Sequence, residues 1–499
     1  MQEKFVDIIA DERGQVTVFL TLIFMILMGA IFCVLEGMNI YMETSLSEET
    51  FIDAGNDVLS NYSRDLFERY HIFFLDPREK KQIVSDGINY MEHYLDKSSY
   101  FAFHCDNLVL SEEKTAVDED GLYLKHQIRE WMKYRQMGKA EKAIEELFDS
   151  ASTVEKELGA VKDEMNSVDE GKTDTAASES DSDTGQQGKE NSKEGIEWKS
   201  LKETLGQISH SGILGYAVDD LSKLSDLTVS ADDFPSRKKG VSKGRNSDFT
   251  LSFSALSEWK NLLGNLDIDI PDSHFLSDEY FLFGYIFEHF NCYGSENSNL
   301  PSALKYEIEY LIGGENSDQE NLKKVANRIL ILRFLMNYSY ACRDKEINAV
   351  AGAMADTLCG VLGLPAAGGA VRILLIAAIS YGESLLELHT LFSGGEIAAV
   401  KDASTWNLYF HNATELLTTK AKVKSGVNNV GYEDYIKLLL AMNKHPKVIY
   451  FRMMDLMQAN IALKQPGFLM EQCIFRFRWQ GNMVCSMGIS VPLDRVCSY

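Results

Sequence analysis

The feature that most constrains this chain is an uncharged apolar run near its N-terminus. Residues 16–35 read VTVFLTLIFMILMGAIFCVL, twenty residues without a charge. A helix rises about 1.5 Å per residue, so the run covers roughly 30 Å, the thickness of the hydrocarbon in a bilayer. A secretory signal peptide has a shorter apolar region and an Ala-x-Ala type cleavage site, whereas EGMN (36–39) follows here. The run therefore predicts a retained transmembrane helix that contacts the lipid bilayer.

The positive charges around the run predict its orientation. Lys4 and Arg13 precede it, and no Lys or Arg follows until Arg64. Because basic flanks stay on the cytoplasmic side, we expect residues 1–15 in the cytoplasm and residues 37–499 outside. The chain is thus predicted to be a single-pass protein of the cell membrane with an extracellular body.

Composition limits the partners of this body. The chain has 49 Lys and Arg residues against 74 Asp and Glu residues, a net charge of −25. Nucleic acids and anionic lipids attract proteins through cations, so the charge argues against nucleic-acid binding and against docking on an anionic lipid surface.

Residues 36–150 are predicted as a stalk helix followed by a membrane-proximal region. An apolar stripe at helical spacing continues the membrane helix and ends near a breaker at Asp76-Pro77. The apolar face of this stalk needs a partner, either its own domain or another subunit. The stripe consists of Phe51, Ala54, Val58, Tyr62 and Leu66.

The composition changes over residues 166–195. This segment has no aromatic residue, and Val168 is its single large aliphatic residue. It cannot bury enough apolar surface to offset the entropy lost on ordering, so it is predicted to be a disordered acidic linker.

The main extracytoplasmic domain is predicted over residues 200–499, and its pattern is mainly helical from Phe249 on. Ser317 and Glu320 form a capping box that opens one helix. The apolar stretch 349–379 is interrupted by two charges and a proline, so it predicts buried core helices rather than a second span. Further helices are predicted over 79–97, 122–147, 435–442 and 448–461, and a strand over 100–110.

The C-terminal residues alternate with the period of a strand. Phe475, Phe477 and Trp479 share one face, which leaves two arginines on the other, solvated face. A turn predicted at 480–482 makes a β-hairpin, whose second strand runs on to Pro492. The fold class is therefore α+β and predominantly helical: a transmembrane helix that continues into a stalk, a helical body and a small C-terminal hairpin.

Motifs for catalysis and for metal or cofactor binding are scarce. The chain has no HExxH, GxGxxG, GxxxxGK[ST] or GxSxG motif. Glu288, His289 and Cys292 are close together but fall short of a metal ligand set, which favours a structural histidine. The eight cysteines contain no CxxC pair, and Cys33 lies in the predicted span, so we assign no disulfide. We predict no catalytic residue, no metal site and no cofactor.

One pair of acids resembles a catalytic dyad at first sight. Glu307 and Glu309 lie two residues apart on a predicted helix, so they point to different faces and form no dyad. We expect both on a solvated face.

One enzyme pattern stays open as an alternative. Penicillin-binding proteins use S-x-x-K, S-x-N and K-[ST]-G in this order, and the serine attacks a carbonyl while a neighbouring base takes its proton. The chain holds these patterns at 257–260, 295–297 and 424–426. Because S-x-x-K recurs elsewhere and the last pattern lies in a polar loop, a serine enzyme of this type is the runner-up function. A ligand-binding sensor domain is a third candidate.

The sequence also resembles known families. The start, RGQVTVFL (13–20) and onward to Glu36, resembles the N-terminus of TadE/TadG-like pseudopilins of tight-adherence pilus systems. Type IV-like prepilins carry a glutamate five residues after the processed glycine, and Phe19 holds that place after Gly14 here. More of the chain resembles an uncharacterised family of membrane-anchored proteins from Gram-positive, largely clostridial bacteria. That resemblance rests on residues 59–76, 127–135, 306–322, 382–401 with Trp406, and 432–461.

The resemblance implies a structural rather than a catalytic function. It implies a surface-exposed, single-span protein that is a minor pseudopilin or an assembly component, and it supplies no catalytic residue. The leading prediction is therefore a structural or assembly component of a pilus or secretion system, with other subunits bound through the stalk helix. Glu36 at the outer end of the span is the residue predicted to meet either water or a neighbouring subunit.

Overall fold

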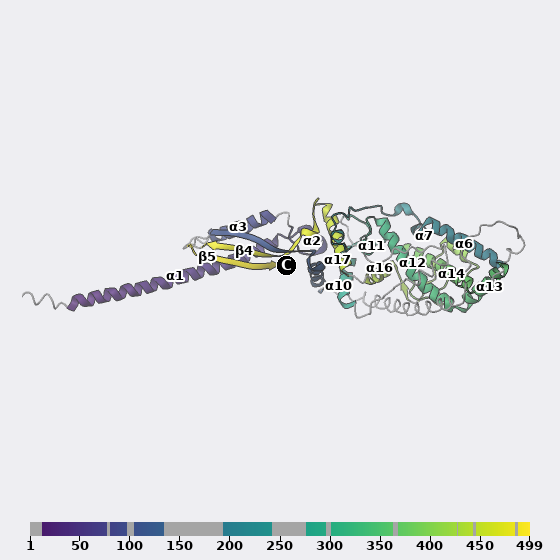
Figure 1. Ribbon diagram of the computed structural model, residues 1–499, viewed down its shortest axis with the longest axis horizontal. Helices are drawn as coiled ribbons and strands as arrows, with labels where there is room; N and C mark the ends of the chain where they lie inside the picture. The colour runs from purple at the N-terminus through teal and green to yellow at the C-terminus, as the bar shows by residue number, and fades with distance from the viewer. Residues whose placement is uncertain are drawn as a thin grey trace, which may run out of the picture. The chain divides into compact units, whose positions relative to one another are not determined.

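The structure is a computed structural model, and its chain divides into two compact units that are each described by themselves. The terminal unit combines Met1–Asp118 with Glu471–Tyr499, and the central unit is Glu119–Met470. Figure 1 shows their elements with the labels used below. The described residues are 12–76, 80–96, 104–133, 193–241, 276–295, 301–362, 368–426, 428–442, 446–484 and 488–499.

The terminal unit is built on α1 (Glu12–Ser60), one continuous helix of 49 residues. At about 1.5 Å per residue it is roughly 70 Å long. Its most apolar window lies at the N-terminal end, and none of that window is buried. The helix is thus long and apolar enough to anchor the chain in a membrane, in agreement with the run at 16–35.

The C-terminal part of α1 is covered by protein. Phe51, Ala54 and Val58 are buried, and they belong to one hydrophobic core with residues of the sheet described next, among them Trp479. The apolar stripe on the stalk therefore packs against the chain's own domain.

The stalk helix predicted to continue to Asp76-Pro77 is wrong beyond Ser60. An antiparallel bridge joins Tyr62 to Leu75, so the chain folds back on itself within this segment. The short helix α2 (Arg64–Tyr70) lies inside the fold-back. Leu66 is buried on α2, a separate helix. Its position in the sequence keeps the helical spacing of the stripe, although the chain folds back after Ser60.

A three-stranded antiparallel sheet completes the terminal unit, with β4 in the centre and β1 and β5 at the edges. Phe477 and Trp479 face the core, as the alternation predicts. Arg478 lies on the other face, where it forms ion pairs with Glu112 and Asp494. The central strand thus comes from the C-terminus, which the sequence pattern grouped with the main domain. The strands are β1 (His104–Thr115), β4 (Ile474–Val484) and β5 (Ser490–Ser498).

The turn predicted at 480–482 is wrong, although the hairpin itself is confirmed. Strand β4 continues through these residues and stays paired with β5 as far as Val484 and Ser490, where the chain reverses. Gly481 has a different purpose, since a Cβ atom there would lie 2.9 Å from Cδ1 of Leu108 on β1. A glycine inside a strand often marks such a close approach rather than a turn.

The central unit consists mainly of packed helices (Figure 1). The hydroxyl of Ser317 accepts a hydrogen bond from the N–H of Glu320 at 3.2 Å, which confirms the capping box. The second apolar stretch, 349–379, covers most of α13 and the first half of α14. Helix α14 is buried from Leu375 to Phe392, as predicted for a core helix, whereas α13 is buried on one face only and exposes Val350 by 40%. The main helices are α10 (Leu276–His289), α11 (Glu307–Gly313), α12 (Asp318–Arg343), α13 (Lys345–Leu362), α14 (Gly368–Phe392), α16 (Tyr432–Ala441) and α17 (Pro446–Ala462).

Several predictions fall partly outside the described residues. The strand predicted over 100–110 is described from His104 on, as part of β1. The helix predicted over 122–147 is described as α4 (Leu122–Met132), and its remainder is not among the described residues. The same holds for most of the acidic linker predicted over 166–195. The last three residues of that linker are helical, because α6 (Lys193–Ser211) begins there.

The terminal unit should fold without the central unit. The two points where the chain leaves and re-enters it lie side by side, since Thr115 pairs with Ile474 and the N–H of Ala116 donates to the carbonyl of Cys473 at 2.9 Å. Replacing 119–470 by a short Gly-Ser turn therefore adds little strain. We expect protected amides throughout β4 in hydrogen exchange of the detergent-solubilised protein.

The matched control for this excision is the same shortened chain with Trp479→Ala. Trp479 is fully buried and is among the largest side chains in the core, so its loss should cost about 3–5 kcal/mol and remove the protection. Unprotected β4 amides in the shortened chain with Trp479 intact would contradict the autonomy of this unit.

A buried ion cluster as candidate functional site

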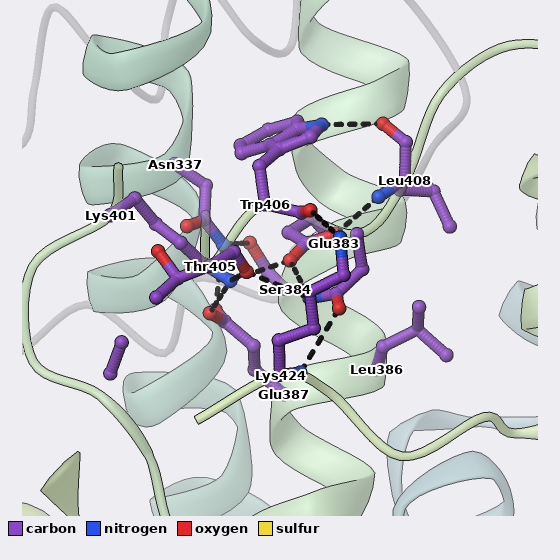
Figure 2. Close-up of polar contacts among 12 residues, drawn as sticks. Asn337, Glu383, Ser384, Leu386, Glu387, Lys401, Thr405, Trp406, Leu408 and Lys424 are labelled. Atoms are coloured by element: carbon purple, nitrogen blue, oxygen red, sulfur yellow. Dashed lines mark hydrogen bonds and ion pairs between the residues drawn. The ribbon is translucent and has the colours of Figure 1, made fainter. Parts of the chain in front are cut away.

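Four charged side chains meet inside the central unit, and Figure 2 labels three of them, Glu383, Glu387 and Lys401. Arg333, Glu383, Glu387 and Lys401 have side-chain exposures of 0–2%. We call these four residues the buried ion cluster. Two of them are cationic and two anionic, so the cluster is neutral as a whole.

Helix periodicity brings these side chains together. Glu383 and Glu387 are four residues apart on α14, so they share one face of that helix. Arg333 on α12 packs against that face, and α12 and α14 are extensively in contact. Lys401 comes from the segment that follows the short strand β2 (Ile397–Ala398). Three stretches that are distant in sequence therefore supply the cluster.

Arg333 binds Glu387 with the two-pronged geometry of a guanidinium and a carboxylate. Its Nε lies 2.7 Å from Oε2 and its Nη2 2.6 Å from Oε1 of Glu387. The remaining nitrogen, Nη1, donates to the carbonyls of Ala398 and Ala399 and to the hydroxyl of Tyr435. Such charge-assisted, bidentate bonds are stronger and more directional than neutral ones.

Lys401 links the two glutamates. Its Nζ lies 2.6 Å from Oε1 of Glu383 and 2.8 Å from Oε1 of Glu387, and it also donates to the carbonyl of Thr405 at 2.9 Å. Glu383 in addition accepts from Asn407 Nδ2 at 2.7 Å and from the N–H of Leu408 at 2.9 Å. Each carboxylate oxygen of Glu383 thus has a donor.

The electrostatics favour the charged forms of Glu387 and Lys401. Burial by itself disfavours the charge of Glu387, but the adjacent Arg333 and Lys401 outweigh it and hold the pKa of this carboxyl below its ordinary value. Burial likewise opposes the charge of Lys401, and the two glutamates overcome it and raise its pKa. A lysine held as a cation has no lone pair with which to attack a substrate.

The cluster therefore holds elements of the fold together. It links α12, α14 and the segment around residues 398–408, and each of its four charged groups has an ion-pair partner. Replacing a whole buried ion network by apolar groups is often neutral, whereas removing one member leaves a buried charge uncompensated. Its contribution is the specific mutual placement of these elements.

Glu307 and Glu309 on α11 were expected on a solvated face, and this is wrong because both are fully buried. Glu307 accepts the N–H of Asn291 at 2.8 Å and Nδ2 of Asn460 at 2.6 Å. Glu309 accepts the N–H of Tyr293 at 2.8 Å and the hydroxyl of Tyr432 at 2.7 Å. The two acids thus bind the backbone of the loop at 291–293. Their donors, the N–H groups of residues 291 and 293, lie two residues apart, as the two acids do.

Glu309 differs from the ion cluster because no cation contacts it among the described residues. Its second oxygen, Oε2, is buried and has no hydrogen-bond partner there. Burial raises the pKa of this carboxyl to about 7, although its bonds to Tyr293 and Tyr432 oppose the shift. Asp455 is a weaker case of the same kind: burial raises its pKa to about 6, against bonds from Ser236 and Tyr310.

The metal-type residues noted in the sequence do not form a site. Among the described residues no group of three or more His, Cys, Asp and Glu side chains is placed to hold a metal ion. His289 is buried, and its ring centroid lies 4.4 Å from that of Tyr285. Cys292 is a buried thiol whose pKa is raised, mainly by burial.

The penicillin-binding pattern is only partly described. Its 257–260 element and Asn297 lie outside the described residues. Lys424 is described, and it lies in an irregular segment rather than on a strand, with its Nζ donating to the carbonyl of Trp406 at 3.0 Å. This lysine therefore binds the backbone of the segment 405–408, which also contacts Lys401 and Glu383 of the ion cluster (Figure 2).

Sequence reasoning missed the buried ion cluster, although a signal for it exists. Arg333 stands alone in the apolar run ILILRFLM, and Glu383 with Glu387 interrupts the apolar helix α14. A charge inside an apolar helix must be compensated within the core, so such residues indicate an inward-facing pair. The identity of the compensating groups depends on tertiary contacts.

The fold and this site define a class of protein: a helical body fastened by buried charges, in a chain that also carries an apolar N-terminal helix. The model of a family of unknown function, DUF5702, matches residues 187–485, more than half of the chain, and the protein belongs to this family. The matched residues contain the complete ion cluster and begin after α1. Comparisons with curated proteins and with solved structures found no match.

The ion cluster predicts strongly coupled mutations. Arg333→Met leaves Glu387 buried with a single cation and should destabilise the central unit by about 3–5 kcal/mol. Adding Glu387→Leu removes the orphaned charge, so the double variant should be more stable than Arg333→Met alone. Denaturant unfolding of the four members of this double-mutant cycle measures the coupling.

A surface pair supplies the control for this cycle. Arg478 pairs with Glu112 and Asp494 at the surface of the sheet, and Arg478→Met should have a much smaller effect on stability. Additive effects of Arg333→Met and Glu387→Leu would contradict the structural role of the cluster.

Glu309 predicts a stability that falls as the pH rises. Its pKa in the folded protein, about 7, is above the unfolded value, so the folded state binds the proton more tightly. The stabilisation is complete below the unfolded pKa and is lost as the pH rises through about 7. Glu309→Gln should therefore reduce the loss of stability between about pH 5 and pH 8.

Asp455 provides the companion variant, because its raised pKa acts in the same direction. Unfolding midpoints of Glu309→Gln should depend less on pH than those of the wild type, and those of Glu309→Gln with Asp455→Asn less still. An unchanged pH profile in Glu309→Gln would show that this carboxyl does not titrate in this range.

Proposed function

We propose that the protein is a membrane-anchored structural component of a pilus or secretion assembly, with its N-terminus in the cytoplasm and its body outside the cell. The observation that carries the proposal is the continuity of α1. One unbroken helix includes the exposed apolar run and the segment that packs under the antiparallel sheet. Such a helix can hold a folded unit at a defined distance from a bilayer without a flexible joint.

The site is consistent with a structural role. The buried charges of the central unit form ion pairs that hold helices and loops together, and the lysine among them is kept as a cation. In pilin-like systems the apolar N-terminal helix both anchors a subunit and packs it against others. This chain has the required helix, and Glu36 at the outer end of the run is exposed and available to meet a neighbouring subunit.

Orientation is the first test of the proposal. Protease added to intact, wall-stripped cells should digest the body beyond residue 36 and leave an N-terminal fragment, because Lys4 and Arg13 favour a cytoplasmic N-terminus. Immunoblotting with tags at both ends reports the two fragments. Full protection of the body in intact cells, with digestion after lysis, would refute the orientation.

Assembly is the second test. Glu36→Gln should still insert in the membrane but co-purify with fewer pilus components, because the variant loses the charge offered to a neighbouring subunit. Glu48→Gln is the matched control, since Glu48 is also exposed on α1 but lies farther from the span. Equal co-purification of Glu36→Gln, Glu48→Gln and the wild type would leave α1 as a plain anchor.

A further inference from the structure

The exposed apolar surface of α1 extends beyond the predicted span. Among the large side chains that follow the span, Met38, Tyr41 and Met42 are exposed by 57%, 74% and 53%. We call these three residues the collar. Cover by the chain's own fold begins with the next residue, since Glu43 is buried, and Ser47 and Thr50 follow on the same helical face. The collar therefore lies between the span and the folded part of the terminal unit.

The exposed segment of α1 is longer than the hydrocarbon of a bilayer is thick. From Val16 to Met42 the helix rises roughly 40 Å. A hydrocarbon core is about 30 Å thick, and a bilayer with its headgroup regions is about 40–45 Å thick. The difference leaves about 5–8 Å of headgroup region on each side. With residues 16–35 in the hydrocarbon, the collar begins about 5 Å beyond Leu35, inside the outer headgroup region, and ends near its outer edge, about 10 Å beyond Leu35. Tyrosine is enriched at this depth, because its ring is apolar and its hydroxyl is polar.

The charges of α1 select the kind of headgroup. The exposed acids near the collar are Glu36, Glu48 and Glu49, whereas no Lys or Arg occurs between Arg13 and Arg64. Anionic headgroups would be repelled by this segment, and basic residues that normally attract them are missing from the sequence there. Headgroups without net charge can contact the collar without this penalty.

We propose that the collar is a docking surface for lipid headgroups of zero net charge and seats the terminal unit directly on the outer surface of the membrane. The proposal rests on the proposed function, because it requires the span. It goes further by naming a second lipid contact, its chemical class and the residues that make it. The terminal unit then begins where the headgroups end, without an aqueous gap between them.

Site-specific photocrosslinking of the full chain in lipid nanodiscs tests this proposal. The photoreactive residue p-benzoylphenylalanine replaces Phe24 within the span, Tyr41 in the collar, or Asn56, each exposed on α1. Asn56 lies 15 positions, or about 22 Å along the helix, beyond Tyr41. In phosphatidylcholine discs, positions 24 and 41 should give lipid adducts by mass spectrometry, and position 56 should give none.

Each outcome separates the two proposals. No lipid adduct at position 24 refutes the membrane anchor itself. An adduct at 24 without one at 41 refutes the collar and leaves the anchor intact, and a crosslink from 41 to a second copy of the chain also overturns the collar as a lipid surface. Because the three positions are exposed, the variants should fold, and the protection of β4 amides confirms that they do.

A change of lipid tests the preference for headgroups. In discs with a large fraction of phosphatidylglycerol, the adduct yield at position 41 should fall severalfold, while the yield at position 24 stays the same. Glu36→Gln in the position-41 variant should restore part of the yield. Equal yields at position 41 in both kinds of disc would refute the selection for uncharged headgroups.

Discussion

The two-pronged bond between Arg333 and Glu387 is the interaction on which the central unit depends. A guanidinium buried at 0% exposure is tolerated in an apolar core only if its charge and its donors are all compensated. Glu387 supplies the charge, and the carbonyls of residues 398 and 399 and the hydroxyl of Tyr435 accept from Nη1. Satisfying one buried charge therefore dictates where α14 and a distant loop lie relative to α12.

The same rule extends through Lys401 to Glu383, which in turn binds the backbone at Leu408. Elsewhere in the unit, Glu307 and Glu309 hold a loop by its backbone N–H groups. The central unit thus uses buried carboxylates mainly to fix irregular segments, whose backbone groups have no partners of their own in a helix or a sheet. This arrangement is consistent with the structural role proposed above.

The terminal unit solves a different problem. Its long helix requires cover for an apolar stripe, and a single local hairpin offers little area and is marginally stable by itself. The chain supplies the cover from both ends, by pairing β1 with β4, and the central unit is inserted between these strands. A body of more than three hundred residues can be accommodated between two adjacent strands, because the insertion points are neighbours in the sheet.

Local sequence patterns predicted much of this protein. An uncharged run of twenty residues, the helical spacing of Phe51, Ala54 and Val58, and the capping box at Ser317 all depend on neighbours within a few positions, and α1 and α12 follow from them. The alternation around Trp479 likewise predicted a strand. Some predictions were wrong, such as the turn at 480–482 and the solvated face for Glu309. They share one physical reason, because these features depend on contacts between residues far apart in the chain.

The turn predicted around Gly481 is one example. A side chain at this position would collide with Leu108 on another strand, so the glycine reflects a tertiary contact and not a turn. Glu309 is buried because Tyr432, more than a hundred residues away, reaches its carboxylate. The sequence by itself determined the anchor-like helix, the mainly helical class and the amphipathic faces, because periodicity is a local property. Tertiary structure alone decided which charges are buried together and which strands pair, because compensation of a charge and closure of a sheet require partners that no local pattern names.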